Sequence, residues 1–147
     1  MNVRLVWAAG LLAGLLTGCQ TAPVVDQMER AWLAQAITDY RIEVLVVNSI
    51  WHAQSHQITV RAGQMADAAA SCIPAPFEGG QCRVEAFTAE DFTVAGLFRK
   101  VRSLSTTPPA EITYDPAYHF PSQIAFDDPN LVDEDWMWRV TGFEVLK

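Results

Sequence analysis

The sequence contains few basic residues and even fewer histidines and cysteines. Among its 147 residues are ten Lys and Arg against 17 Asp and Glu, with three His and three Cys. Nucleic acids require clustered positive charge, so the acidic balance argues against them as partners. An anionic membrane surface repels an acidic protein, so attachment through a basic patch is also disfavoured.

Recognisable catalytic and metal-binding motifs are missing as well. Ser55 beside His56, and Ser122 near His119, do not stand in a G-x-S-x-G elbow. His52 and His56 fall in a predicted loop between strands, and on a strand their spacing would be about 13 Å, too far for one metal ion. We therefore predict no catalytic residue, no metal ligand and no cofactor, and expect that the protein is not an enzyme.

An acidic segment, residues 127–135, lacks the alternating oxygen ligands and the glycine of an EF-hand loop. We interpret it as a solvated hairpin loop. Calcium binding by this segment remains open at this point.

No apolar run reaches the length of about 20 residues that a membrane-spanning helix needs. The longest run covers residues 5–16 and follows Arg4, the only charge among the first 18 residues. This arrangement is typical of a signal peptide. We expect an exported protein.

The end of this run, Leu16-Thr17-Gly18-Cys19, resembles a lipobox, after which lipoprotein signal peptidase cuts. The resemblance implies that residues 1–18 are removed and that Cys19 carries a diacylglycerol and an acyl chain such as palmitate. Two or three acyl chains anchor a protein stably. The alternative is an ordinary secretory signal with an incidental cysteine.

Cleavage there defines a lipidated tether, residues 19–25, and a single domain, residues 26–147. Loss of Arg4 leaves nine basic residues against 17 acidic ones, a net charge of −8. The lipid rather than a basic patch would therefore hold the protein at the membrane. Gln20 resembles the residue that follows the lipidated cysteine in outer-membrane lipoproteins. We expect a cell-envelope location, on the periplasmic face of the outer membrane.

The two remaining cysteines, Cys72 and Cys82, form an even pair in an oxidising compartment. We predict a disulfide between them. Closing the loop of about 11 residues between them would stabilise the fold by at most about 2.8 kcal/mol in the chain-entropy model. A pair of metal thiolates is the alternative, although C-x-x-C spacing is absent.

Hydrophobic periodicity predicts a first helix over residues 26–39, with Asp26 as N-cap and Glu29 completing a capping box. Apolar side chains at four-residue intervals, from Met28 to Tyr40, would face the core. Alternating residues then predict three antiparallel strands at residues 40–47, 57–62 and 64–69. Residues 71–89 are predicted to be irregular.

A second helix is predicted after Thr93, with its apolar residues on one face and Pro108-Pro109 preventing its continuation. Three further strands follow at 111–114, 123–126 and 136–145. In the last strand the apolar phase changes across Gly142, which predicts a β-bulge there. The order α-βββ-α-βββ indicates an α+β fold, an antiparallel sheet with two helices packed on one face.

Several motifs occur together in the chain. They are Trp32, Tyr40, residues 58–63, Thr93-Val94 with Leu97-Phe98, residues 112–116, residues 118–124, Asp127 and the acidic group 133–135. This set resembles the DUF6174 family of bacterial envelope lipoproteins, which has no assigned activity. The chain departs from the family pattern because residues 44–51 lack a cysteine pair and His119-Phe120 replaces a glycine-aromatic pair, so a ligand of the family need not be shared.

The turn after residue 114 is the candidate binding element, because it gathers aromatic side chains on a backbone stiffened by two prolines. Its residues are Tyr114, Asp115, Tyr118, His119, Phe120 and Pro121. The alternative is that Asp115 caps the turn and the aromatic rings pack on the sheet.

Together these features favour a non-catalytic envelope lipoprotein that binds another protein or an envelope component, through an exposed sheet face or through this turn. One alternative is a small periplasmic hydrolase or metal-dependent enzyme using His119 and nearby carboxylates. A structural accessory without a ligand is another.

Overall fold

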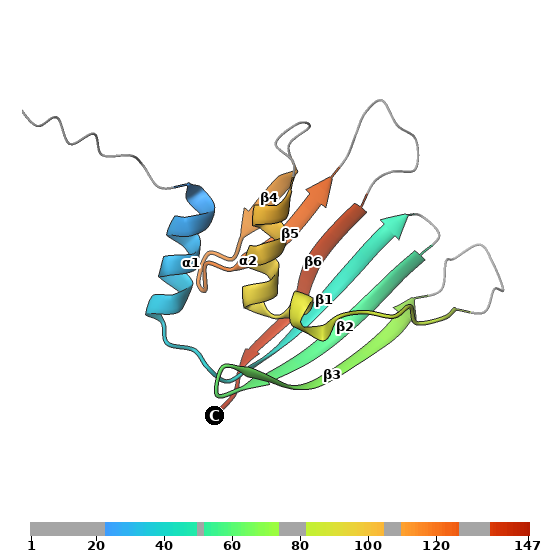
Figure 1. Cartoon of the computed structure of the whole chain (residues 1–147), viewed down its shortest axis with the longest axis horizontal. Coiled ribbons are helices and arrows are strands. Elements are labelled where there is room, and N and C mark those ends of the chain that lie inside the picture. Colours follow the sequence, from blue (N-terminus) through green and yellow to red (C-terminus); the bar gives the residue numbers. More distant parts are fainter. Residues whose placement is uncertain (1–22, 50–51, 74–81, 105–109, 127–135) are drawn as a thin grey trace, which may run out of the picture.

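The computed structural model describes residues 23–49, 52–73, 82–104, 110–126 and 136–147. All six strands form one sheet of order β3-β2-β1-β6-β5-β4, and every neighbouring pair is antiparallel. The strands are β1 (Tyr40–Ser49), β2 (His52–Arg61), β3 (Gln64–Ile73), β4 (Glu111–Tyr114), β5 (Pro121–Phe126) and β6 (Trp136–Val145). The helices are α1 (Val24–Ala34), α2 (Val94–Ser103) and a short 3₁₀ helix η1 (Ala89–Phe92). The predicted α+β class and antiparallel sheet are confirmed (Figure 1).

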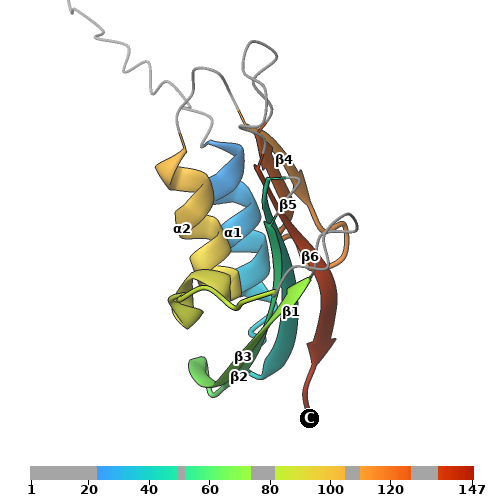
Figure 2. The ribbon, with the colours of Figure 1, turned by 90° about the vertical axis from the view of Figure 1, so that its right-hand side faces the viewer.

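The two halves of the chain meet at the centre of the sheet, where β1 pairs with β6. Each half adds its other two strands outward, so the first half forms one side of the sheet and the second half the other. Figure 2 shows α1 and α2 side by side on the same side of the sheet. The core lies between these layers, with Ile42, Val44, Ile58 and Phe98 completely buried.

The first helix is shorter than predicted. It begins at Val24 and ends at Ala34, and Ala36 has a left-handed backbone with φ 52°. Since Tyr40 opens β1, it does not extend the helical stripe, and Leu33 is 65% exposed. The chain turns early because Tyr40 is buried under α2, where its hydroxyl accepts a hydrogen bond from the Val94 N–H at 3.2 Å.

The predicted capping box at Asp26 is wrong. Pro23 occupies the N-cap position without a side-chain hydrogen bond, and Asp26 lies in the first turn. The Asp26 and Glu29 carboxylates instead accept hydrogen bonds from Arg102 of α2. This contact joins the two helices on their exposed side.

The start of α2 confirms the prediction from Thr93. The Thr93 hydroxyl oxygen accepts the Gly96 N–H at 3.0 Å and donates to the Glu90 carbonyl at 2.8 Å. This N-cap fixes η1 against the first turn of α2. Gly96 is needed there because a Cβ at this position would overlap the backbone of Glu90 and Asp91.

The predicted β-bulge in β6 is confirmed. Glu43 faces Gly142 while Val44 faces Val140, so Thr141 is an extra residue in β6. The bulge lets Trp138 and Val140 on one side of it, and Phe143 on the other, pack against the same core. This explains why the apolar phase changes at Gly142.

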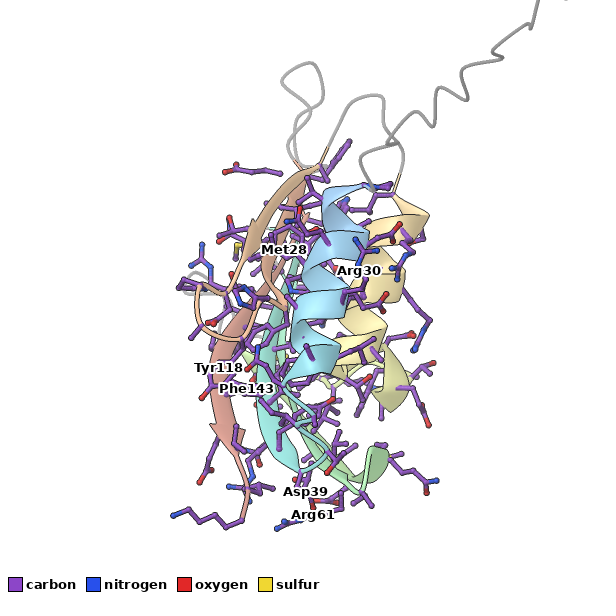
Figure 3. All side chains as sticks on the ribbon, turned by 90° about the vertical axis from the view of Figure 1, so that its left-hand side faces the viewer. Met28, Arg30, Asp39, Arg61, Tyr118 and Phe143 are labelled. Carbon is purple, nitrogen blue, oxygen red and sulfur yellow. A yellow bond between two sulfur atoms is a disulfide. The ribbon has the colours of Figure 1, made fainter. Side chains whose placement is uncertain are left out.

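All three strands in the first half are longer than predicted, and β1 ends at Ser49 rather than at residue 47. β2 begins at His52 rather than at residue 57, and β3 continues to Ile73. The hairpin between them turns at Ala62 and Gly63, which both have positive φ, as two-residue hairpin turns require. Next to this turn, Arg61 Nη1 lies 3.5 Å from Asp39 Oδ1 (Figure 3).

Candidate functional site

A cavity of about 550 Å³ opens between the sheet and the segment that leads into α2. We call it the aromatic cleft. The sheet contributes Val46, Asn48, His52, Gln54, His56, Trp136 and Trp138, and the opposite wall is formed by residues 85–88, Asp91, Phe92 and Lys100. Its size is that of a site for a small organic molecule.

The floor of the cleft is the inward face of β2. In the inner half of this strand Ile58 and Val60 are buried in the core. Toward the other end of β2 the same face carries His52, Gln54 and His56, of which Gln54 and His56 are also buried. Successive residues on one face lie two apart in a strand, so the core face of β2 changes from apolar to polar where it reaches the cleft.

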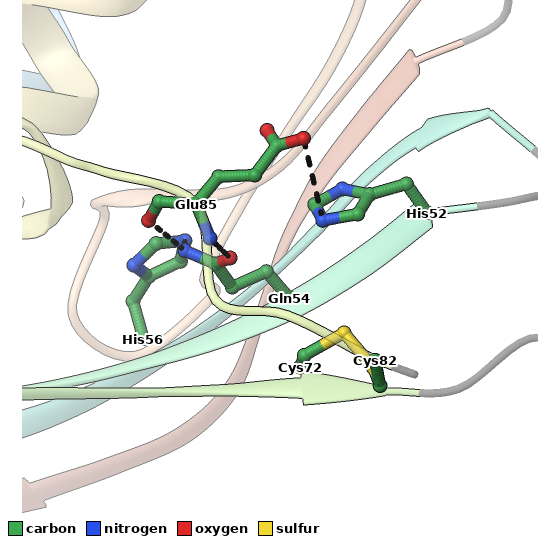
Figure 4. A network of polar contacts seen from close by, with 6 residues as sticks. All are labelled: His52, Gln54, His56, Cys72, Cys82 and Glu85. Carbon is green, nitrogen blue, oxygen red and sulfur yellow. Dashed lines mark hydrogen bonds and ion pairs between the residues drawn. A yellow bond between two sulfur atoms is a disulfide. The ribbon is translucent and has the colours of Figure 1, made fainter. Parts of the chain in front are cut away.

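Gln54 holds the opposite wall in place. Its Oε1 accepts the Glu85 N–H at 2.8 Å, and its Nε2 donates to the Glu85 carbonyl at 3.2 Å (Figure 4). The predicted disulfide between Cys72 and Cys82 is present and ties the end of β3 to the start of the same segment. Residues 82–88 are thus fixed to the sheet by a covalent bond and by a paired amide.

These contacts assign the proton on His56. Both bonds to Glu85 fix the orientation of the Gln54 amide, so the group facing His56 Nε2 at 3.3 Å is an N–H donor. Nε2 is therefore an acceptor, and the proton of the neutral ring lies on Nδ1. Burial lowers the pKa of His56 to about 4, so the ring is neutral at pH 7.

The Nδ1–H of His56 is a buried donor without a hydrogen-bond partner among the described residues. Only 2% of the His56 surface is exposed. An unpartnered buried polar group is costly. His56 is one of the residues that line the cleft, so an acceptor that reached its Nδ1 would remove this cost.

Aromatic rings continue from His56 to the rim. The imidazole stacks on Phe92 at 3.7 Å between centroids and meets the edge of Phe87 at 4.7 Å. Phe92 in turn stacks on Trp138 at 4.8 Å. Mutual stacking keeps these rings in fixed orientations, so one side of the cleft is rigid and apolar.

Lys100 of α2 lies at the Trp138 end of this stack. Its ammonium nitrogen is 4.8 Å from the ring centroid of Trp136 and 4.9 Å from that of Trp138, within the range of a cation–π interaction. Among the described residues no carboxylate forms an ion pair with it. The cleft also contains two carboxylates: Asp91 lies 3.7 Å from the guanidinium of Arg99, and Glu85 lies 3.7 Å from His52 Nε2, which is a charged partner only when His52 is protonated.

The turn predicted as a binding element has a different character. Asp115 Oδ1 accepts the N–H groups of Ala117 and Tyr118 at 2.9 and 2.7 Å. Phe120 and Pro121 are buried, and Tyr118 stacks on Phe120 and lies 4.8 Å from Phe143 (Figure 3).

The other members of the turn belong to the same arrangement. Tyr114 is half-buried and packs against the core, and His119 has φ 66° with its N–H donating to the Asp115 carbonyl. The structure therefore brings the six turn residues together, but their aromatic rings pack inward and none of them lines the aromatic cleft.

Two predicted sites lie outside the described residues: the lipid-attachment residue Cys19 and the acidic segment 127–135. Within the described ranges, no three His, Cys, Asp or Glu side chains are grouped as metal ligands. No helix in these ranges has the length and apolarity to cross a membrane.

Sequence reasoning misplaced part of the cleft and missed the rest. His52 and His56 are strand residues, not loop residues. Gln54, Phe92, Lys100 and the tryptophans of β6 were not recognised as a site. One signal was available: the alternation of Ile58 and Val60 continues backward as His56, Gln54 and His52, which indicates a polar stretch on a buried face.

The family model described as "Family of unknown function (DUF6174)" matches residues 24–145. The chain belongs to this family. Comparisons with curated proteins and with solved structures find no match.

Proposed function

We propose that this protein is a non-catalytic, lipid-anchored protein of the bacterial cell envelope, whose domain binds an envelope component in the aromatic cleft. The anchor is Cys19, and the location is the periplasmic face of the outer membrane. The observation that carries the binding function is a cavity walled by stacked aromatic rings and lined by His56, whose buried Nδ1–H has no partner among the described residues.

Rigidity supports this assignment. The cleft wall is held by the Cys72–Cys82 disulfide and by the two hydrogen bonds between Gln54 and Glu85. A wall fixed in this way keeps the cavity open without a ligand, which lowers the entropic cost of binding. The packed turn around Phe120 offers fewer accessible side chains to a partner than the cleft does.

The chemistry of the cleft supports binding rather than catalysis. Its described lining contains no serine or cysteine nucleophile. His56 is stabilised in its neutral form, and its Nε2 already accepts a hydrogen bond from Gln54. A general base needs a pKa near the working pH and a free acceptor nitrogen.

Photo-crosslinking in intact cells tests the proposal. Benzoylphenylalanine replaces Ala86, which lines the cleft, or Thr141, which is exposed on β6 and outside it. We expect a discrete adduct from position 86 and none from position 141. The adduct should disappear when Trp136→Ala and Trp138→Ala remove the facing wall. Equal adducts from both positions, or an adduct that survives the double substitution, would contradict the cleft as the binding site.

The same cultures test the anchor. Cells fed an alkyne analogue of palmitate should label the wild-type protein and leave the Cys19→Ser variant unlabelled. Label on the Cys19→Ser variant, or a wild-type protein recovered unlabelled from the medium, would refute lipid attachment at this residue.

A further inference from the structure

We infer that the ligand of the aromatic cleft is an organic acid: an apolar body that carries a carboxylate or a similar oxyanion. This inference rests on the proposed binding function and specifies the ligand class. It follows from which groups of the cleft already have partners and which do not.

Among the described residues, two histidines of the cleft floor have buried ring nitrogens without a hydrogen-bond partner: both nitrogens of His52, and Nδ1 of His56, which is a donor. The amide of Gln54 is fully engaged with Glu85 and His56, and the network places the free proton on His56 Nδ1. A donor at this position requires an acceptor on the ligand, such as a carboxylate, carbonyl or hydroxyl oxygen. An ammonium group has donors only and cannot fill this position.

The cleft contains a positive charge that has no ion pair among the described residues. This charge belongs to Lys100, which is held over Trp136 and Trp138. Asp91 is paired with Arg99, whereas Glu85, 3.7 Å from His52 Nε2 and 65% exposed, has a charged partner only when His52 is protonated. A cation fixed by aromatic rings is positioned to receive an anion at little entropic cost. Charge-assisted hydrogen bonds to an ammonium are about twice as strong as neutral ones.

The apolar body of the ligand follows from the rest of the wall. Phe87, Phe92 and Trp138 present a rigid aromatic surface along the cavity. A cavity of about 550 Å³ exceeds what a bare anion such as phosphate occupies, so the anionic group must be joined to an apolar part that contacts these rings.

Three probes with one apolar body separate this inference from its alternatives. They are 3-phenylpropionate, 3-phenylpropan-1-ol and 3-phenylpropylammonium, which share the phenyl group and differ in the charge and the hydrogen-bonding groups of the head group. Each is titrated at pH 7 into the mature protein with Cys19→Ser, and Kd is read from the indole N–H signals in ¹⁵N NMR spectra. We expect the carboxylate to bind about tenfold more tightly than the alcohol, and the ammonium to bind most weakly.

Two variants assign the preference to named groups. Lys100→Met should remove the advantage of the carboxylate over the alcohol, whereas Lys147→Met makes the same change in net charge outside the cleft and should preserve it. His56→Phe keeps the stacking on Phe92 but removes the donor, so it should weaken the carboxylate and the alcohol by about three- to tenfold and leave the ammonium unchanged.

The possible outcomes distinguish the inference from the function beneath it. Equal affinity for the carboxylate and the alcohol, tightest binding of the ammonium, or a carboxylate preference that survives Lys100→Met would overturn the acid ligand while leaving the cleft as a binding site. Absence of binding by all three probes would overturn both.

Discussion

The turn of residues 115–121 and the aromatic cleft contain similar kinds of residue but differ in how their groups are satisfied. In the turn, Asp115 accepts two backbone N–H groups and Phe120 is 1% exposed. In the cleft, the His56 donor has no hydrogen-bond partner and Lys100 has no ion pair among the described residues. A polar or charged group whose partners lie within the protein contributes to its stability, whereas a group without a partner is available to a ligand.

The largest expected difference between the two regions is in stability. Phe120→Ala removes a fully buried ring that contacts Trp32, Tyr118 and Phe143, and should lower the free energy of unfolding by about 3–5 kcal/mol. Phe87→Ala removes a half-buried ring of the cleft wall and should cost about 1 kcal/mol. Urea unfolding measures both.

Binding should show the reverse order. Phe87→Ala should weaken binding of 3-phenylpropionate, while Phe120→Ala should leave its Kd nearly unchanged under conditions in which the variant remains folded. A Phe120→Ala protein with unchanged stability would show that the turn is not part of the core, and would restore it as a candidate binding element.

A smaller change in the free energy of unfolding is expected for a substitution at Gly96, where α2 meets the cleft wall. Alanine in a helix is normally favoured over glycine by about 1 kcal/mol. Here the new Cβ would overlap backbone atoms of Glu90 and Asp91, so Gly96→Ala should instead destabilise by about 1–3 kcal/mol. Thermal and urea unfolding check the sign.

Gly142→Ala is the matched control. Its Cβ would lie 3.5 Å from the Glu43 Cβ, an ordinary contact, so its effect on the free energy of unfolding should be small. If Gly96→Ala proved as stable as Gly142→Ala, the contact between α2 and η1 would not define the wall of the cleft.

The sequence predicted the elements well and the cleft poorly, for one physical reason. Alternation and caps are local, so the strand phase at Gly142, the N-cap at Thr93 and the disulfide could all be read from neighbouring residues. The end of α1 could not, because Tyr40 leaves the helical pattern to reach the Val94 N–H, 54 residues later. Long-range contacts of this kind override local propensity.

The two walls of the cleft are brought together by such long-range contacts. Gln54 bonds to Glu85, 31 residues away, and the ring of Phe92 in η1 stacks on that of Trp138 in β6, which is distant in sequence. The turn was predicted as a binding element because its aromatic residues lie close together in the sequence. In the turn, local clustering of aromatic residues therefore indicated core packing, whereas the proposed binding cleft lies where polar residues interrupt a buried face.

The smallest predicted effect is the pH dependence of stability due to His56. Its pKa in the folded protein, about 4, is below the ordinary value of 6.5 because burial disfavours the charged ring. Between these values the unfolded chain binds a proton that the folded protein does not. The contribution of the neutral ring to stability is therefore complete above about pH 6.5, and it is lost as the pH falls toward 4.

Comparison of variants isolates this contribution. The fall in the thermal unfolding midpoint from pH 7 to pH 5 should be smaller for His56→Phe than for the wild type, since the other titrating groups of the cleft, His52, Glu85, Asp91 and Lys100, are present in both. His119→Asn removes a histidine of the turn, where asparagine tolerates φ 66°, and should behave as the wild type. Equal falls for His56→Phe and the wild type would mean that His56 is not held neutral by burial, and its Nδ1–H would lose its standing as the donor that recognises an acid.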